Sequence, residues 1–241
     1  MADARKLAAA ALLRVEADGG YSNIVLNSAL NTSEISHADR ALASALFYGV
    51  LDRRITIDWL LSKHIKTPLK KVAPYTLTVL RCAVYQIAFM EKIPESAAVN
   101  EAVKLIKASG ERRNAAFVNA VLRNIIRTGT DLPYGNDVRT LSVRYSCPEW
   151  IVKSFINDYG EENAVELLSQ SLKTPPVTVR VNTVRTTPER LIKILEEIKP
   201  GVDYLKETDL IGGKILDSLK IVQLVGELND EFDIEITPID I

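Results

Sequence analysis

The sequence has few cysteines and aromatic residues, and it contains no long apolar run. Its 241 residues include two cysteines, Cys82 and Cys147, too few for a disulfide framework, so we expect a reducing, cytoplasmic compartment. The first apolar run, from Leu7 to Leu13, is short and Ala-rich and is closed by Arg14. No run approaches the roughly 20 apolar residues of a membrane span. These absences argue against a secreted disulfide scaffold, a signal peptide and a membrane protein.

Ligands for a metal ion are also scarce. The two histidines, His37 and His64, have no Cys or His companion at ligand spacing, so we predict no metal site. Cys82 stands in a stretch that is apolar nearly all round, which is typical of a core cysteine.

Charge is distributed unevenly along the chain, although the formal net charge of the whole is only −1. Residues 1–146 carry a net charge of +7, residues 147–188 carry −1, and residues 189–241 carry −7. Such asymmetry favours an anionic partner for the first part and a basic partner for the last.

Hydrophobic periodicity predicts a mainly helical protein. Before residue 128 the pattern indicates about seven helices joined by short loops and no convincing strand. Of these, residues 72–90 are the best candidate for a central buried helix. Residues 128–136 resemble a linker, and the patterns at 137–160 and 161–172 are again helical. Alternation at Val177–Asn182 predicts a strand, which we expect to pair with residues 232–236. Residues 188–197 and 216–231 predict the last two helices.

Several motifs in order carry a family resemblance. Residues 1–188 resemble the NusB-like domain and following connector of the bacterial ribosomal RNA cytosine-C5 methyltransferases, the RsmB or Sun family. Two positions depart from that pattern: Cys147 replaces an expected His, and Ala116 replaces a common Gly. The motifs that match are Asp39–Leu42, Tyr48–Arg54, Pro94–Val103, Phe117–Asn124, Leu141–Trp150, Tyr159–Glu162 and Pro175–Asn182.

This resemblance implies RNA binding. Phosphate contact needs cationic side chains on one surface, and we expect ribosomal RNA as partner, without DNA specificity. Asn119–Arg123 and Asp39–Arg40 can make internal contacts instead, so the pairs Arg112/Arg113 and Arg53/Arg54 are expected to be better exposed. The RNA-binding candidates are Arg53, Arg54, Lys70, Lys71, Arg112, Arg113, Arg123 and Arg127.

The resemblance to the methyltransferases ends before a catalytic domain would begin. Gly212-Gly213 follows no strong strand, and no glycine-rich turn for S-adenosylmethionine is present. Neither cysteine is a good candidate for the nucleophile that attacks the base. We therefore predict no catalytic residue, no S-adenosylmethionine site and no enzymatic activity for this chain.

The last fifty residues resemble an acyl carrier protein, nearest the short carriers allied to D-alanyl carriers. The match rests on Leu191–Glu197, Pro200–Tyr204, Asp209–Ile211, Leu216–Leu219 and Phe232–Ile236. It implies that Ser218 carries 4′-phosphopantetheine, with a phosphopantetheinyl transferase and carrier-dependent enzymes as partners. A serine at a helix start suits a phosphodiester, although it also suits a plain N-cap.

These observations predict three domains: a NusB-like bundle at 1–128, a helical connector with the start of an α/β segment at 129–188, and a truncated carrier-like segment at 189–241. Whether such a fusion is natural stays open. The leading function is RNA binding as the recognition region of a 16S ribosomal RNA methyltransferase. The alternatives are an acyl or D-alanyl carrier through Ser218, and a protein-interaction module without an RNA role.

Overall fold

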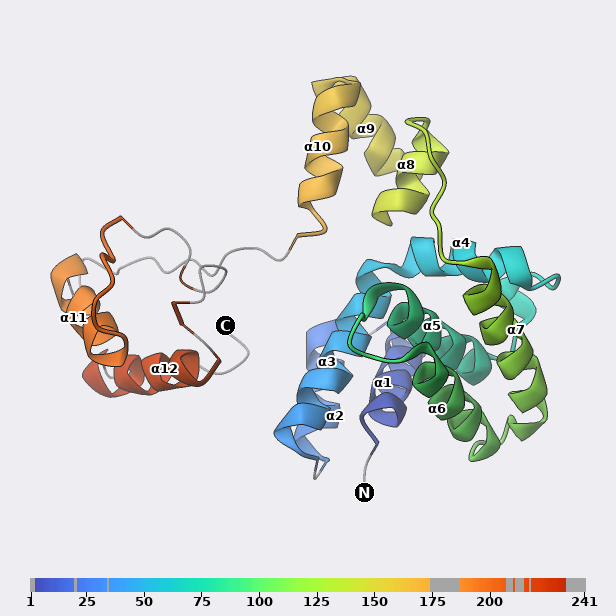
Figure 1. Cartoon of the computed structure of the whole chain (residues 1–241), viewed down its shortest axis with the longest axis horizontal. Helices are drawn as coiled ribbons and strands as arrows, with labels where there is room; N and C mark the ends of the chain where they lie inside the picture. The colour runs from blue at the N-terminus through green and yellow to red at the C-terminus, as the bar shows by residue number, and fades with distance from the viewer. Residues whose placement is uncertain are drawn as a thin grey trace. The chain divides into compact units, whose positions relative to one another are not determined.

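The structure, a computed structural model, describes residues 3–19, 21–33, 35–173, 187–206, 210, 215–216 and 218–232. The chain divides into two compact units, Met1–Leu172 and Lys173–Ile241, which are described separately below. Every regular element in the described ranges is a helix (Figure 1). The prediction of a mainly helical fold is therefore confirmed.

The first seven α-helices form the bundle that the sequence predicts. Polar side chains cap two of them: Asp3 accepts a hydrogen bond from the Arg5 amide, and Ser36 accepts one from the Asp39 amide. The helices are α1 (Ala4–Asp18), α2 (Ser22–Asn31), α3 (His37–Asp52), α4 (Arg54–His64), α5 (Pro74–Phe89), α6 (Glu95–Lys107) and α7 (Ala115–Thr128), with 3₁₀ turns η1 (Leu69–Lys71) and η2 (Arg112–Asn114).

Helix α5 lies at the centre of the bundle and contacts α1, α3, α4, α6 and α7. It is buried on nearly every side, including Val79, Leu80, Cys82 and Val84, so the expected central helix is confirmed. Because α3 packs closely on α5, a Cβ at Gly49 would lie 2.0 Å from Cζ of Tyr85. Only glycine leaves room for that ring.

A single residue separates helices α3 and α4. Helix α3 ends at Asp52, and Arg53 has φ −102° and ψ 16°, outside the helical region, before α4 begins at Arg54. The break lets α4 change direction and pack on α5, α7 and α8. Periodicity cannot reveal such a one-residue break, since both halves have apolar faces.

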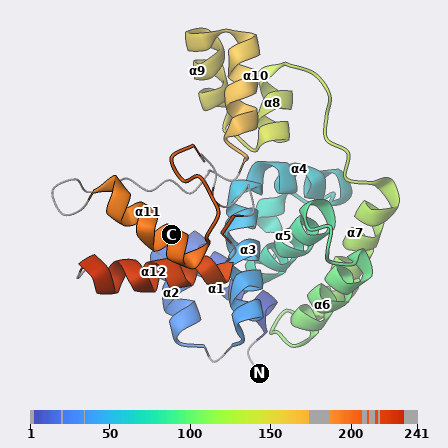
Figure 2. The same cartoon turned by 60° about the vertical axis from the view of Figure 1, so that its left-hand side comes forward.

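Helices α8 (Val138–Tyr145), α9 (Glu149–Tyr159) and α10 (Glu161–Gln170) follow the bundle within the same unit. They share a small core of Leu141, Val152 and Leu168. Two hydrogen bonds tie α8 to α4: Thr56 Oγ1 donates to the Val143 carbonyl at 2.5 Å, and Ser146 Oγ accepts from the Ile55 amide at 3.2 Å. Figure 2 shows α8 beside α4.

The second unit contains α11 (Pro188–Ile198) and α12 (Ser218–Phe232). Their apolar faces share a core of six buried residues, Ile194, Leu195, Ile198, Leu216, Leu224 and Leu228. The strand predicted at 177–182 lies outside the described residues, as does its proposed partner beyond Phe232. Phe232 itself is the last residue of α12 and packs against this core.

Among the helices described, none has the length and apolar character needed to cross a bilayer.

Candidate nucleic-acid interface

A groove of about 580 Å³ runs between α6 and α7, which lie side by side in Figures 1 and 2. Exposed polar side chains come from one face of α6, at Asn100, Lys104 and Lys107, because residues three or four apart share a helix face. Asn119 of α7 supplies the opposite wall. The opposite face of α6, including Val99, Ala102 and Ile106, is buried in the bundle. The groove is therefore an open, cationic surface feature.

Two exposed arginines extend this surface along α7. Arg123 Nε donates to Asn119 Oδ1 at 3.0 Å, one turn away, and Arg127 Nη2 donates to Asn124 Oδ1 at 2.7 Å. The sequence predicted that the Arg123–Asn119 contact could keep Arg123 from solvent. The contact forms, yet Arg123 stays exposed, because both residues lie on the outer side of the helix.

A histidine, His64, lies beside the last turn of α7. Asn124 Nδ2 is 2.9 Å from His64 Nδ1, and Thr128 Oγ1 is 3.4 Å from His64 Nε2, which joins α7 to the end of α4. Partial burial, with the positive charge of Lys63 as a smaller cause, lowers the pKa of His64. The surroundings of His64 therefore disfavour protonation of its ring.

We define the α7 strip as Asn119, Arg123 and Arg127 of α7 together with Lys104 and Lys107 of the adjoining α6. The only acid within ion-pair distance of any of these residues, among those described, is Glu101, whose Oε2 lies 3.5 Å from Lys104 Nζ. The strip thus has four cations and one peripheral carboxylate.

Other predicted cations flank the strip. Arg112 and Arg113 are exposed on η2, immediately before α7, and Lys70 and Lys71 are exposed on η1, which contacts α4. None of these four has a carboxylate at ion-pair distance in the described part of the chain. These four residues remain candidates for RNA binding.

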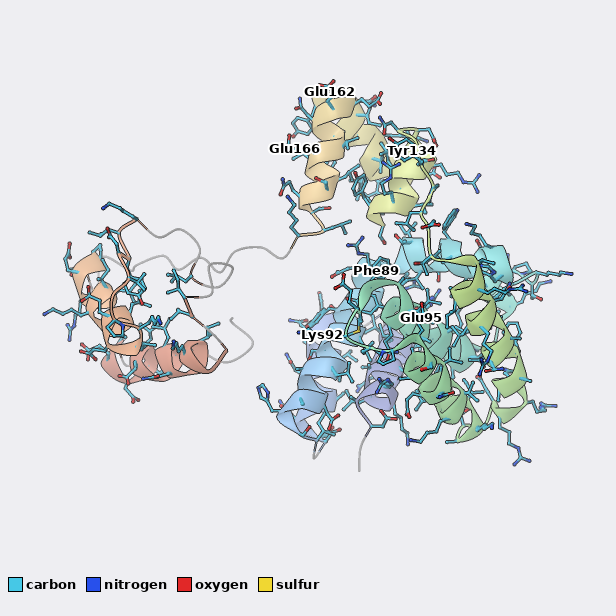
Figure 3. The ribbon with its side chains drawn as sticks, viewed as in Figure 1. Phe89, Lys92, Glu95, Tyr134, Glu162 and Glu166 are labelled. Carbon is cyan, nitrogen blue, oxygen red and sulfur yellow. The ribbon has the colours of Figure 1, made fainter. Side chains whose placement is uncertain are left out.

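The arginine pair at the junction of α3 and α4 contacts other side chains of the bundle. Arg53 is half-buried, with its guanidinium carbon 4.9 Å from the centre of the Phe89 ring. Arg54 Nη2 lies 3.0 Å from Glu16 Oε1, and 44% of its side chain is exposed. The expectation that this pair is better exposed than Arg123 is wrong, because the neighbouring helices supply an aromatic ring and a carboxylate. Figure 3 marks Phe89.

Sequence reasoning missed Lys104, Lys107 and Asn100. Their signal was available: the spacing 100, 104, 107 puts three polar residues on the face of α6 opposite its apolar one. What the sequence could not provide was Asn119, which only the packing of α7 against α6 brings to the groove.

The cysteines occupy structural positions. Cys82 is 3% exposed, and burial raises the pKa of its thiol to about 12, which suppresses the reactive thiolate. Cys147 is half-buried and burial raises the pKa of its thiol as well. In the described ranges no group of three or more His, Cys, Asp or Glu could hold a metal ion.

In the second unit, α12 begins at Ser218, in agreement with the expected helix start. The Ser218 side chain lies outside the described atoms. Glu227, Asp230 and Glu231 are exposed along α12, and Glu231 forms an ion pair with Arg190 of α11.

The bundle, with its polar groove on the α6–α7 side, is a helical domain of known type. Residues 2–127 match the model of the NusB family, and residues 147–207 match that of the RsmF/B-like methyltransferase ferredoxin-like domain. The chain belongs to the NusB family.

Curated relatives fall into two groups. The chain is 37% identical over 190 residues to the probable ribosomal RNA small subunit methyltransferase B of Bacillus subtilis, covering 78% of this chain and 42% of that protein. It is 30% identical over 123 residues to the transcription antitermination protein NusB of Shewanella baltica, covering 51% of this chain and 92% of that protein. The solved structure of PH0851 shares the fold with a TM-score of 0.58 at 17% identity, and the match covers 82% of this chain and 45% of that one.

The prediction that this protein is not an enzyme is wrong. The match to relatives named methyltransferase B covers 78% of the chain for the Bacillus protein and 82% for the Synechocystis one. The chain spans less than half the length of these relatives, 42% and 45%. A cofactor motif missing from 241 residues is therefore no argument against methyl transfer.

The boundary of the carrier-like segment also needs correction. The ferredoxin-like match continues to residue 207, so residues 189–207 belong to the same matched domain as α9 and α10. The shared helix at 188–197 thus has a place in the methyltransferase-like part. Amphipathic helices of this length recur in unrelated families, which explains why the sequence alone favoured a carrier.

Proposed function

We propose that this chain binds ribosomal RNA through the α7 strip and serves as the RNA-recognition part of a small-subunit ribosomal RNA cytosine methyltransferase. The observation that carries the proposal is the groove in which exposed Lys104 and Lys107 face Asn119 of the opposite helix. The names of the methyltransferase relatives support the substrate class.

The chemistry of the strip suits a phosphate backbone. Lysine and arginine side chains donate hydrogen bonds to phosphate oxygens, and binding them releases counterions from the nucleic acid. The asparagines add neutral donors that can reach phosphate or sugar oxygens. Contacts of this kind position an RNA without reading its sequence, so we expect little discrimination between sequences. Arg112, Arg113, Lys70 and Lys71 would lengthen the contact, whereas the inward contacts of Arg53 and Arg54 leave them a smaller part.

The experiment is fluorescence anisotropy with a structured fragment of small-subunit ribosomal RNA. Affinity should fall steeply as salt rises from about 50 to about 200 mM, because several phosphates are neutralised. The double variant K104E/K107E should bind far more weakly and show a shallower dependence on salt.

A matched control is K153E, which reverses an exposed lysine on α9, outside the α7 strip. Figure 3 marks Glu162 and Glu166 on α10, the helix that packs on α9. We expect K153E to bind like the wild type. Equal losses in both variants, or binding that does not change with salt, would contradict the proposal.

Ser218 supports a second candidate function, attachment of 4′-phosphopantetheine. The observation in its favour is the start of α12 at this residue, where free amides and the helix dipole attract an anionic group. Intact mass after incubation with coenzyme A and a phosphopantetheinyl transferase tests it. A gain of one phosphopantetheine that S218A abolishes would support a carrier; an unchanged mass of the folded wild type would remove this candidate.

A further inference from the structure

The loop between α7 and α8 presents a tyrosine entirely to solvent. Tyr134 is 100% exposed, whereas Leu132, two residues earlier, packs against the bundle core. Figure 3 marks Tyr134 on this loop, beside α8. An aromatic ring that buries no surface contributes nothing to folding through the hydrophobic effect. The ring is therefore free to contact a ligand.

The loop that carries Tyr134 is held in place. Arg144 Nη2 of α8 donates to the carbonyl of Pro133 at 3.2 Å and to that of Gly135 at 2.9 Å. These carbonyls belong to the residues on either side of Tyr134, so one guanidinium holds the loop both before and after it. The exposed ring thus projects from an ordered support.

The same guanidinium adds positive charge to this position. The Arg144 guanidinium carbon lies 5.4 Å from the centre of the Tyr134 ring and 5.9 Å from that of Tyr145. No carboxylate lies within ion-pair distance of Arg144 in the described ranges. An exposed aromatic ring beside an unneutralised guanidinium is a combination that binds nucleobases, through stacking and through attraction to the nearby phosphate.

The loop also continues directly from α7. Thr128, the last residue of α7, approaches His64 at the end of the α7 strip, and Tyr134 follows six residues later. An RNA strand that follows the cations of the strip toward the end of α7 would therefore next meet this loop.

We propose that Tyr134 is a stacking platform for an unpaired base of the bound RNA, an inference that rests on the proposed function. It narrows the substrate class: the RNA has a single-stranded or bulged nucleotide next to the part whose phosphates contact the α7 strip. A fully paired helix offers no base face to the ring, because each base is already stacked in the duplex.

The test compares two RNAs, a hairpin with a single-stranded 3′ tail and the same hairpin with a blunt end, by anisotropy with the full chain. Y134A should weaken binding of the tailed RNA by about 5-fold to 150-fold, the range for loss of one base–aromatic stack. Binding of the blunt hairpin should not change. The dependence on salt should keep the wild-type slope, because tyrosine neutralises no phosphate.

Two further variants act as controls. Y134F keeps the ring and should bind the tailed RNA like the wild type. Y21A removes a tyrosine that is 79% exposed at the start of α2 and should have no effect on either RNA.

The inference is overturned if Y134A binds the tailed RNA normally, or loses the same affinity for both RNAs. A lower thermal midpoint in Y134A together with loss of both RNAs would likewise make Tyr134 a structural residue. Failure of the proposed function has a different signature: the wild type itself would bind neither RNA in a salt-dependent way.

Discussion

The arginine at the centre of the bundle and the arginines on α7 belong to one domain, but their surroundings differ. Only 5% of the Arg81 side chain is exposed, with Nε 2.7 Å from Asp58 Oδ1 and Nη1 2.6 Å from Glu16 Oε1. Arg123 and Arg127 are exposed, and their described partners are neutral asparagines. Carboxylates thus neutralise the interior cation, whereas the outer face of α7 keeps its charge.

The difference shows how one residue type serves two purposes. A buried guanidinium is tolerated only when carboxylates replace its lost hydration, as Asp58 and Glu16 do for Arg81. An exposed guanidinium that touches an amide oxygen is oriented without being neutralised, so it remains available to a phosphate. Charge counts along the sequence cannot separate the two kinds of arginine.

Removing the interior cation should have the largest effect. R81M should lower the free energy of unfolding by about 3 to 5 kcal/mol, because it leaves the partly buried Asp58 without a partner and leaves Glu16 with Arg54 alone. Urea unfolding followed by circular dichroism measures this loss. R123M, the matched change on α7, should leave the unfolding midpoint nearly unchanged. Similar losses in both variants would remove the distinction between the two regions.

A neutral interior contact should matter less than the buried ion pair. T56V removes the hydroxyl that donates to the Val143 carbonyl and ties α4 to α8, at a fully buried position. We expect a loss of about 1 to 3 kcal/mol, the cost of a buried polar group left unpaired. Urea unfolding again gives the value, with S62A on the exposed side of α4 as the control. A midpoint as high as that of S62A would contradict this prediction.

The outer face should respond through binding instead of stability. R123E and R127E should each weaken RNA binding and reduce the slope of affinity against salt by about one. Their thermal midpoints should stay close to that of the wild type, since neither side chain has an ion-pair partner to lose among the described residues. An unchanged slope would show that RNA does not touch the α7 strip.

The two cysteines distinguish interior from surface by their reactivity. Cys82 should resist alkylation in the folded protein, since burial raises the pKa of its thiol to about 12 from 9.0. Half-buried Cys147 should react first, although burial raises the pKa of its thiol too. Because the Cys82 pKa is higher in the folded state, its contribution to stability is complete below pH 9.0 and is lost as pH rises toward 12. Mass spectrometry after brief alkylation measures the labelling of each cysteine, with C82A as the control. Early labelling of Cys82 would contradict this prediction.

The smallest effect concerns His64. Its pKa in the folded protein should lie below 6.5, so its contribution to stability is present above pH 6.5 and is lost as pH falls through the lowered value. Bound RNA should raise this pKa, since phosphates near Asn124 and Thr128 would favour the protonated ring. Proton NMR titration of the ring measures both values, and H64Q identifies the signal. A pKa that RNA leaves unchanged would place the phosphates elsewhere.

The sequence determined the helical class of the protein, because periodicity and caps act locally. Asp3, Ser36 and Asp137 each lie just before a helix and accept an amide hydrogen bond from its first turn. The buried character of α5 was equally readable, since its apolar residues leave no polar face. In the last fifty residues the same local signals predicted the helix at 188–197, but residues up to 207 match the methyltransferase-like domain, because an amphipathic helix is compatible with many folds.

Tertiary structure alone decided which cations stay available. Arg54 and Arg123 look alike in the sequence, yet α1 brings Glu16 to Arg54, while the described neighbour of Arg123 is Asn119 of its own helix. Tyr134 could be read from the sequence as a loop residue, but only the folded chain brings Arg144 to both of its neighbouring carbonyls. The physical reason is that helix formation depends on residues a few positions apart, whereas charge neutralisation and loop support depend on partners that packing brings together.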